Sequence, residues 1–193
     1  MAIAGLLLTG GRSQRMGADK ATLPLADGQT LAGAVGAVLR AVADPALEVG
    51  AGASGLRHVS ERVGGRGPLA AVAVGWEALS SAGYRGPTLV LACDMPFVTT
   101  GLLELIAGWP GEASVVPVVS GQAQPLCARL SVAALEEVGS LVAAGRRDMA
   151  AVFDAGPVDW LTGADWGRVC DAGAFRDLDY PADLAALEGT VTR

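Results

Sequence analysis

The chain has 193 residues, and its 51% hydrophobic content against 18% charged residues excludes a disordered chain. The formal net charge of −6 argues against a bulk nucleic-acid binder, because phosphate contacts need a basic face. Apolar runs stop after nine residues, about half of the ~18 that a membrane span needs. The three cysteines are far apart and form no CxxC pair, which fits a reducing cytosol. We therefore expect one cytoplasmic domain over residues 1–193, with neither nucleic acid nor membrane as a partner.

Short apolar runs alternate along the chain with segments of helical period, which is typical of βαβ units around a parallel sheet. Residues 146–176 show no clear period, so we predict irregular structure there. The prediction is an α/β domain of three layers, with a mostly parallel sheet and helices on both faces. In chain order we expect a strand at 3–8, a helix at 31–43, a strand at 46–49, a helix at 68–81, a strand at 89–92, a helix at 100–107, a strand at 114–119 and helices at 132–144 and 182–188.

The segment 8–20 directly follows the first predicted strand, so it lies at the carboxyl edge of the sheet, where open α/β sheets bind ligands. Gly10 and Gly11 let the backbone turn sharply and bring its N–H groups close to a phosphate. No Gly-Lys-Ser/Thr ends the segment, which excludes a Walker A loop. The alternative is an ordinary glycine-rich turn with surface cations. The segment carries three such cations, Arg12, Arg15 and Lys20.

Asp94 follows the apolar run 88–93, which is predicted to be a central parallel strand. A carboxylate at that strand end lies at the ligand-binding edge, and Mg²⁺ takes one or two carboxylates together with substrate phosphates. Pro96 prevents the strand from continuing. The alternative is an Asp that caps a turn or a helix.

Two further segments carry candidate site residues. Gly67 and Pro68 form a good helix start, which by itself predicts only a cap. Asp177 and Asp179 face the same side of an extended segment and repel each other unless a cation lies near them. The alternative for these two acids is a solvent-facing turn before the last predicted helix.

The first segment, Leu-Thr-Gly-Gly-Arg-Ser-Gln-Arg-Met-Gly-Ala-Asp-Lys, resembles the signature loop of sugar-nucleotide-type nucleotidyltransferases. It is most similar to the loop of the molybdenum cofactor guanylyltransferases. A Gly-Pro-Leu-Ala run at 67–70, a Cys-Asp-x-Pro run at 93–96 and a Phe-x-Asp-x-Asp-Tyr-Pro run at 175–181 follow in the order of that family. Thr9 departs from the usual Ala and Tyr180 from the usual Thr. The resemblance implies a Rossmann-like sheet of the nucleotide-diphospho-sugar transferase type.

The resemblance also implies Mg²⁺-dependent transfer of GMP from GTP to molybdopterin, with release of pyrophosphate. Asp94, Lys20 and Arg15 are the implied catalytic residues, and Asp94 and Asp179 the implied metal ligands. The family uses an acidic residue before position 67 to contact guanine, and this chain offers Glu61. Molybdoenzymes or their maturation factors are the implied protein partners. The implied GTP-binding residues are Leu8, Thr9, Gly10, Gly11, Arg12, Lys20, Glu61, Gly67, Pro68 and Asp94.

Other functions stay open at this point. The acids at 177 and 179 also occur in cytidylyltransferases of the same superfamily, whereas the Gly10-Gly11 pair favours guanine. A non-catalytic nucleotide-binding regulator is a second alternative. A third is an oxidoreductase that uses the GxGxxG match at 50–55, but no helix start follows this match, so we predict a flexible turn. His58 is the sole histidine, which excludes a triad or a histidine zinc site, and we expect it at the surface.

Overall fold

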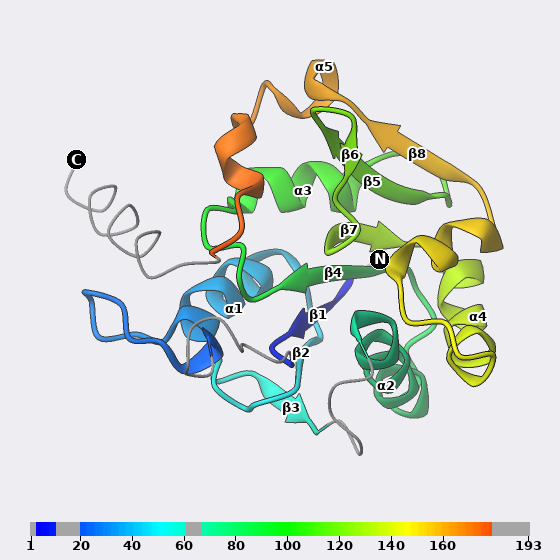
Figure 1. Cartoon of the computed structure of the whole chain (residues 1–193), viewed down its shortest axis with the longest axis horizontal. Helices are drawn as coiled ribbons and strands as arrows, with labels where there is room; N and C mark the ends of the chain where they lie inside the picture. The colour runs from blue at the N-terminus through cyan, green and yellow to red at the C-terminus, as the bar shows by residue number, and fades with distance from the viewer. Residues whose placement is uncertain (1–2, 11–19, 61–66, 179–193) are drawn as a thin grey trace.

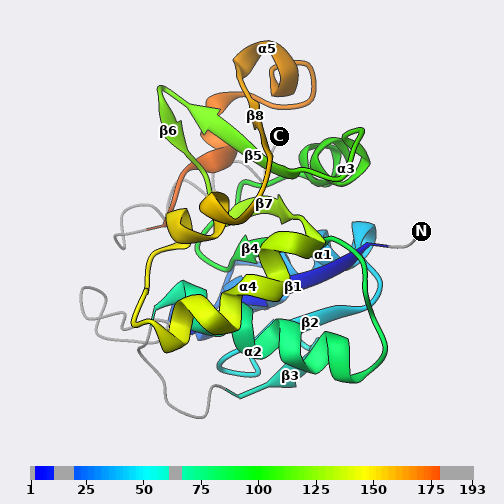
Figure 2. The same cartoon turned by 90° about the vertical axis from the view of Figure 1, so that its right-hand side faces the viewer.

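A central β-sheet with helices on both faces organises the part of the chain that the computed structural model describes, residues 3–10, 20–60 and 67–178 (Figures 1 and 2). The strands are β1 (Ala4–Leu8), β2 (Ala46–Val49), β3 (Arg57–Val59), β4 (Thr88–Ala92), β5 (Ser114–Val119), β6 (Gln122–Ala123), β7 (Cys127–Leu130) and β8 (Val158–Leu161). The α-helices are α1 (Leu31–Val42), α2 (Pro68–Ser81), α3 (Thr100–Gly108), α4 (Val132–Ala143) and α5 (Gly163–Trp166), with 3₁₀ turns η1 (Lys20–Thr22), η2 (Met149–Ala155) and η3 (Ala172–Phe175).

The sheet of the described residues has eight strands in the order β3-β2-β1-β4-β7-β5-β6, and β8 also pairs with β5. Strands β3, β2, β1 and β4 are parallel, whereas β7 is antiparallel to both of its neighbours, β4 and β5. The predicted α/β class with a mostly parallel sheet is confirmed, with β7 as an antiparallel insertion. Leu8 pairs with both Val49 and Ala92, so β1, β2 and β4 end at the same edge.

Alternate side chains of the central strands enter two separate cores, because successive residues of a strand point to opposite faces. Leu7, Leu89 and Leu91 pack against α1 and α3 on one face. On the other face, the apolar side chains that pack against α2 and α4 are Leu6, Leu8 and Val90. In Figure 2 the pair α1 and α3 lies on one side of the sheet and the pair α2 and α4 on the other, which confirms the three-layer prediction.

The contact between α2 and β1 is close because Gly75 has no side chain. A Cβ at Gly75 would lie 2.7 Å from a methyl carbon of Leu6 and 3.0 Å from one of Val49. Protein interiors are close-packed, so a methyl group at position 75 would fit only if its neighbours moved. The glycine therefore sets how closely α2 approaches the sheet.

The long elements match their sequence predictions, whereas most of the short strands were not predicted. Strands 46–49 and 114–119 and helix 68–81 have the predicted bounds, and the other predicted strands and helices within the described residues differ by one residue at one end. Thr99 and Ser131 cap α3 and α4, each accepting a hydrogen bond from the backbone N–H three residues on. Strands β3, β6, β7 and β8 were not predicted, and the predicted helix at 182–188 lies outside the described residues.

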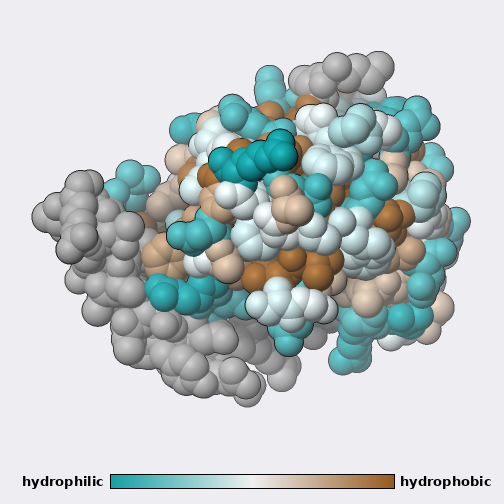
Figure 3. All heavy atoms as spheres, turned by 90° about the horizontal axis from the view of Figure 1, so that it is seen from above, coloured by the Kyte–Doolittle hydropathy of each residue, from teal (hydrophilic) through white to brown (hydrophobic). Residues whose placement is uncertain are grey.

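The outer surface is mixed in character. In Figure 3 the apolar side chains appear in small areas that hydrophilic residues separate. Trp160 and Val169 are the large apolar side chains exposed among the described residues. Within the same ranges, none of the helices combines the length and the apolar character that crossing a membrane requires.

The side chain of Arg129, on β7, binds the C-terminal end of α3 and the loop that follows it. Its guanidinium is buried and donates to the carbonyl oxygens of Ala107 (3.1 Å), Trp109 (2.6 Å), Gly111 (3.1 Å) and Ala113 (3.0 Å). One side chain thus satisfies four carbonyl groups in the turn between α3 and β5.

Replacing Arg129 by Met should destabilise the fold by about 3 kcal/mol, because four carbonyl groups lose the hydrogen bonds that this buried side chain donates. The measurement is the free energy of unfolding from urea titrations. The exposed Arg40→Met on α1 is the matched control and should cost less than about 0.5 kcal/mol. Equal effects of the two substitutions would show that the four hydrogen bonds contribute little.

Candidate active site

The candidate site lies where β1 and β4 end side by side. The Cys93 N–H donates to the Leu8 carbonyl oxygen (3.1 Å), which continues the ladder beyond the last pair. The segment Thr9-Gly10 and the segment Cys93-Asp94 consequently leave adjacent parallel strands at the same edge. This is the edge at which open α/β sheets bind ligands.

Lys20 and Asp94 meet at that edge. The Lys20 ammonium, in η1, lies 3.8 Å from Oδ2 of Asp94, and the side chains are 14% and 34% exposed. A partly exposed pair at this distance stabilises the fold by less than about 1 kcal/mol. The pair therefore contributes little to stability, and its two charges suit a phosphate and a metal ion, respectively.

The backbone of Asp94 is held by the far end of the described chain. The Leu178 N–H donates to the Asp94 carbonyl oxygen at 2.8 Å. Next to Leu178, the Arg176 guanidinium lies 4.5 Å from the ring centre of Phe97, a cation–π contact. These two contacts bring the 175–178 segment beside Asp94, although 84 positions separate Leu178 from Asp94 in the sequence.

A buried carboxylate, Glu48 on β2, organises the neighbouring turn 50–55. Glu48 is 0% exposed, and both of its oxygens accept backbone hydrogen bonds from this turn. Burial raises the pKa of Glu48, but hydrogen bonds from Ser54, Thr9 and Ala53 outweigh burial, so the pKa is lowered overall. A turn forms at 50–55 as predicted, and no helix follows it, because residues 57–59 form β3. The sequence predicted a flexible turn, whereas hydrogen bonds to Glu48 hold this one in place.

The backbone of the turn 50–55 lies in close contact with the backbone at Gly10, where the glycine-rich segment begins. Gly50 has φ +136°, and a Cβ there would lie 2.6 Å from the Gly10 nitrogen. Only glycine allows this approach of two backbones. His58 follows the turn on the edge strand β3 and is exposed, as expected.

Helix α2 begins with Gly67 at its N-cap (φ +90°) and Pro68 in its first turn, so the predicted helix start is confirmed. Because α2 connects β3 to the parallel strand β4, its N-terminus lies at the carboxyl edge. Its unpaired N–H groups and helix dipole favour an anion there. A Cβ on Gly67 would lie 3.0 Å from the Arg147 carbonyl oxygen.

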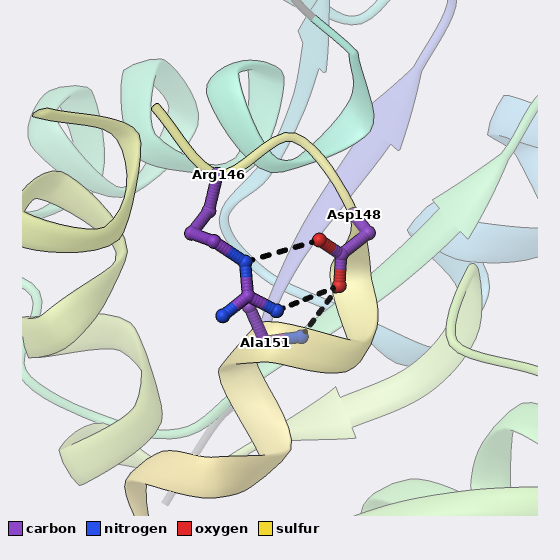
Figure 4. A network of polar contacts seen from close by, with 3 residues as sticks. All are labelled: Arg146, Asp148 and Ala151. Carbon is purple, nitrogen blue, oxygen red and sulfur yellow. Dashed lines mark hydrogen bonds and ion pairs between the residues drawn. The ribbon is translucent and has the colours of Figure 1, made fainter. Parts of the chain in front are cut away.

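The loop that reaches Gly67 is held by an ion pair (Figure 4). Arg146 donates to both oxygens of Asp148 at 3.2 Å, and Asp148 also accepts from the Ala151 N–H at 3.0 Å, which caps η2. This exposed pair fixes the geometry of the loop more than it stabilises the fold.

Comparison with known proteins adds the family. A family model described as "MobA-like NTP transferase domain" matches residues 5–161. The chain belongs to this family. As a MobA-like NTP transferase it is a nucleotidyltransferase, and the resemblance inferred from its motifs is confirmed. The chain is 37% identical over 195 residues to a probable molybdenum cofactor guanylyltransferase of Mycobacterium avium, covering 97% of this chain and 95% of the relative.

Two solved structures share the fold of this MobA-like protein. The molybdopterin-guanine dinucleotide biosynthesis protein A of Archaeoglobus fulgidus superposes with a TM-score of 0.80 at 20% identity, covering 98% of this chain and 99% of that one. The 2-C-methyl-D-erythritol 4-phosphate cytidylyltransferase of Thermus thermophilus gives a TM-score of 0.70 at 20% identity over the full length of both chains. Identities this low establish the common fold alone.

The structure brings together some of the predicted site residues of this MobA-like chain. Leu8, Thr9 and Gly10 lie at the carboxyl edge with Lys20 and Asp94. Five predicted residues lie outside the described ranges: Gly11, Arg12, Arg15, Glu61 and Asp179.

Sequence reasoning missed Glu48 and the side-chain role of Thr9. A Glu within the apolar strand 46–49 was the available signal, because a carboxylate is rarely buried without partners.

Asp94 fits the role of an Mg²⁺ ligand. Its carboxylate is partly exposed at the strand end, and Mg²⁺ uses few protein carboxylates because substrate phosphates supply the other oxygens. No cluster of three His, Cys, Asp or Glu side chains with metal-binding geometry occurs among residues 3–10, 20–60 and 67–178.

The Glu48 anchor predicts a pH dependence of stability. An unfolded Glu titrates near ~4.3, and the folded pKa is lower, so the stabilisation is complete above ~4.3 and is lost as the pH falls below it. The difference in unfolding free energy between wild type and Glu48→Gln should shrink as the pH is lowered from about 6 to about 3. Urea titrations across this range measure it, with the exposed Glu104→Gln on α3 as control. A difference that stays constant over this range would contradict the anchoring role.

Proposed function

We propose that this chain transfers GMP from GTP to molybdopterin and releases pyrophosphate. The observation that carries the proposal is the Lys20–Asp94 pair at 3.8 Å, placed at the carboxyl edge of the sheet in a MobA-like chain. The names of the relatives from Mycobacterium avium and Mycobacterium tuberculosis, at 37% and 35% identity, support this choice of substrates.

In the proposed reaction, a terminal phosphate oxygen of molybdopterin attacks the α-phosphorus of GTP. The bond between the α-phosphorus and the oxygen that leads to the β-phosphorus breaks, and pyrophosphate leaves with that electron pair. Such a displacement needs positioning and charge neutralisation more than covalent participation by the protein.

Each residue of the site has a distinct part in this scheme. Lys20 binds the triphosphate and offsets the charge that develops on the leaving pyrophosphate. The backbone of Leu8, Thr9 and Gly10 orients the guanine, and the N-terminus of α2 at Gly67 and Pro68 adds a positive dipole.

Five parts of the scheme lie outside the described residues and remain predictions. They are phosphate contacts by Gly11, Arg12 and Arg15, a guanine contact by Glu61 and metal ligation by Asp179.

Asp94, with Asp179 as the predicted second ligand, would hold Mg²⁺, which when bound supplies charge neutralisation of the triphosphate. The role of the chain in this arrangement is to present a carboxylate at a fixed strand end. The backbone hydrogen bond from Leu178 holds that end in place.

We propose the reducing cytoplasm as the compartment, since the three cysteines, Cys93, Cys127 and Cys170, lie far apart in the sequence and form no CxxC pair. We also propose molybdoenzymes or their maturation factors as the proteins that receive the product.

The choice of base is tested by calorimetry with a panel of nucleoside triphosphates in Mg²⁺. GTP should bind at least about tenfold more tightly than CTP or ATP, a difference of ~1.4 kcal/mol. A panel in which CTP binds best would assign the chain to the cytidylyltransferases, the fold of which it shares.

Lys20→Ala tests the phosphate contact of the sole lysine of the chain. Loss of a charge-assisted hydrogen bond should weaken GTP binding by roughly 1.5–3 kcal/mol while the fold is retained. Steady-state kinetics at low salt measure the effect, and the exposed Arg40→Ala on α1 is the control for loss of one positive charge. Wild-type kinetics in Lys20→Ala would exclude the proposed phosphate-binding role of this lysine.

Asp94→Asn keeps the shape of the side chain and removes its charge. A loss of about 3–4 kcal/mol in transition-state stabilisation corresponds to a ~10²–10³-fold fall in kcat at saturating GTP. Melting temperature and pyrophosphate release are measured on the same sample. Asp44→Asn, at the opposite edge of the sheet between α1 and β2, is the matched control. An Asp94→Asn protein that melts early but turns over normally would indicate a capping role instead.

A further inference from the structure

The carboxylate of Glu48, on the short strand β2, accepts an unusually large number of hydrogen bonds. Its Oε1 accepts from the Thr9 hydroxyl (2.7 Å), the Gly52 N–H (2.6 Å) and the Ala53 N–H (2.9 Å). Its Oε2 accepts from the N–H (2.8 Å) and the hydroxyl of Ser54. Five donors surround a carboxylate that is 0% exposed, so no oxygen is left to contact a substrate.

Thr9 links this carboxylate to the glycine-rich segment. The Thr9 hydroxyl donates to Glu48 and accepts from the Ala51 N–H at 2.9 Å. Thr9 is 5% exposed, and its own backbone N–H donates to the Val49 carbonyl oxygen at 3.0 Å. One residue therefore joins the end of β1 to the end of β2 through its backbone and to the turn 50–55 through its side chain.

The turn 50–55 is also held from behind by α1. The Thr30 hydroxyl, which caps α1, donates to the Ala53 carbonyl oxygen at 2.7 Å. A Cβ at Gly36 would lie 3.0 Å from the Ser54 Cβ, so the helix and the turn are in close contact. Because the turn is fixed on this side, its other side presents a rigid surface to Gly10, where Gly50 makes its close approach.

We propose that Thr9 and Glu48 are a positioning pair, which sets the place of the Thr9-Gly10 backbone against which the nucleotide binds. The inference rests on the proposed function for the identity of the nucleotide. Neither side chain is a catalytic residue. Both side chains act through the turn 50–55. The nucleotide contacts the Thr9-Gly10 backbone that they position, and not the two side chains themselves.

The pair makes a specific kinetic prediction. Disturbing the backbone at Gly10 should weaken the binding of GTP, whereas Lys20 in η1 and Asp94, which follows β4, keep their geometry. The KM for GTP should therefore rise more than kcat falls. A purely structural role would lower the unfolding free energy and leave the KM unchanged.

The variants are Thr9→Val, which keeps the shape without the hydroxyl, Thr9→Ser, which keeps the hydroxyl, and Glu48→Gln. We expect Thr9→Val and Glu48→Gln to raise the KM for GTP about tenfold, with kcat within about threefold of wild type. Thr9→Ser should recover the greater part of the loss. In the double variant the effects should not add, because both substitutions break one network.

Arg129→Met is the matched control, because it removes a buried charged side chain with four hydrogen bonds at a distance from the site. It should lower the unfolding free energy with the KM for GTP unchanged. If Thr9→Val lowers stability as Arg129→Met does and leaves the KM unchanged, the positioning role is overturned. Should Glu48→Gln fail to fold, Thr9→Val and Thr9→Ser decide by themselves.

Calorimetry keeps this test separate from the test of the proposed function. If the wild-type chain prefers another nucleoside triphosphate, the proposed function fails, and the affinity for that nucleotide replaces the KM as the readout. A loss of about tenfold in affinity in Thr9→Val then still supports the pair. Unchanged affinity overturns it whichever nucleotide the wild type prefers.

Discussion

The parallel pairing of β1 with β2 on one side and β4 on the other is the constraint on which the site depends. Leu8 pairs with Val49 and with Ala92, so the three strands stop at one level. Whatever follows each strand is then delivered to the same edge: the glycine-rich segment, the turn 50–55 and Asp94. A slip of one residue would turn every apolar side chain of β1 to the wrong core, so the two cores enforce the register. The packing that fixes the register of the strands therefore also fixes the geometry of the site.

Two kinds of charged side chain serve this arrangement differently. Glu48 and Arg129 are buried and bind backbone groups. Glu48 thereby shapes the turn 50–55, and Arg129 shapes the C-terminal end of α3 and the loop after it. Lys20 and Asp94 are partly exposed and lie 3.8 Å apart. Charges that are saturated inside the protein organise the backbone, whereas charges with solvent access are suited to a ligand.

Much of the fold was predictable because β1, β4 and the long helices carry strong local patterns. The capping residues Thr99 and Ser131 and the Pro68 helix start were equally legible, since their chemistry acts within one helical turn. Strands β3 and β7 were not, because three or four residues cannot show a period and their pairing depends on distant partners. Strand order and motif resemblance placed Lys20 and Asp94 at the same edge of the sheet, whereas their contact was not predicted. The five donors around Glu48 depend on a turn whose shape no local pattern reveals.

The hydrogen bond from Leu178 to the Asp94 backbone has a consequence for biosynthesis. Chains emerge from the ribosome N-terminus first, and β1, β2 and β4 can pair long before residue 178 is made. The carbonyl of Asp94 receives this partner only when the 175–178 segment has left the exit tunnel and docked. In a nascent chain the edge formed by β1, β2 and β4 is therefore made before the segment that braces Asp94.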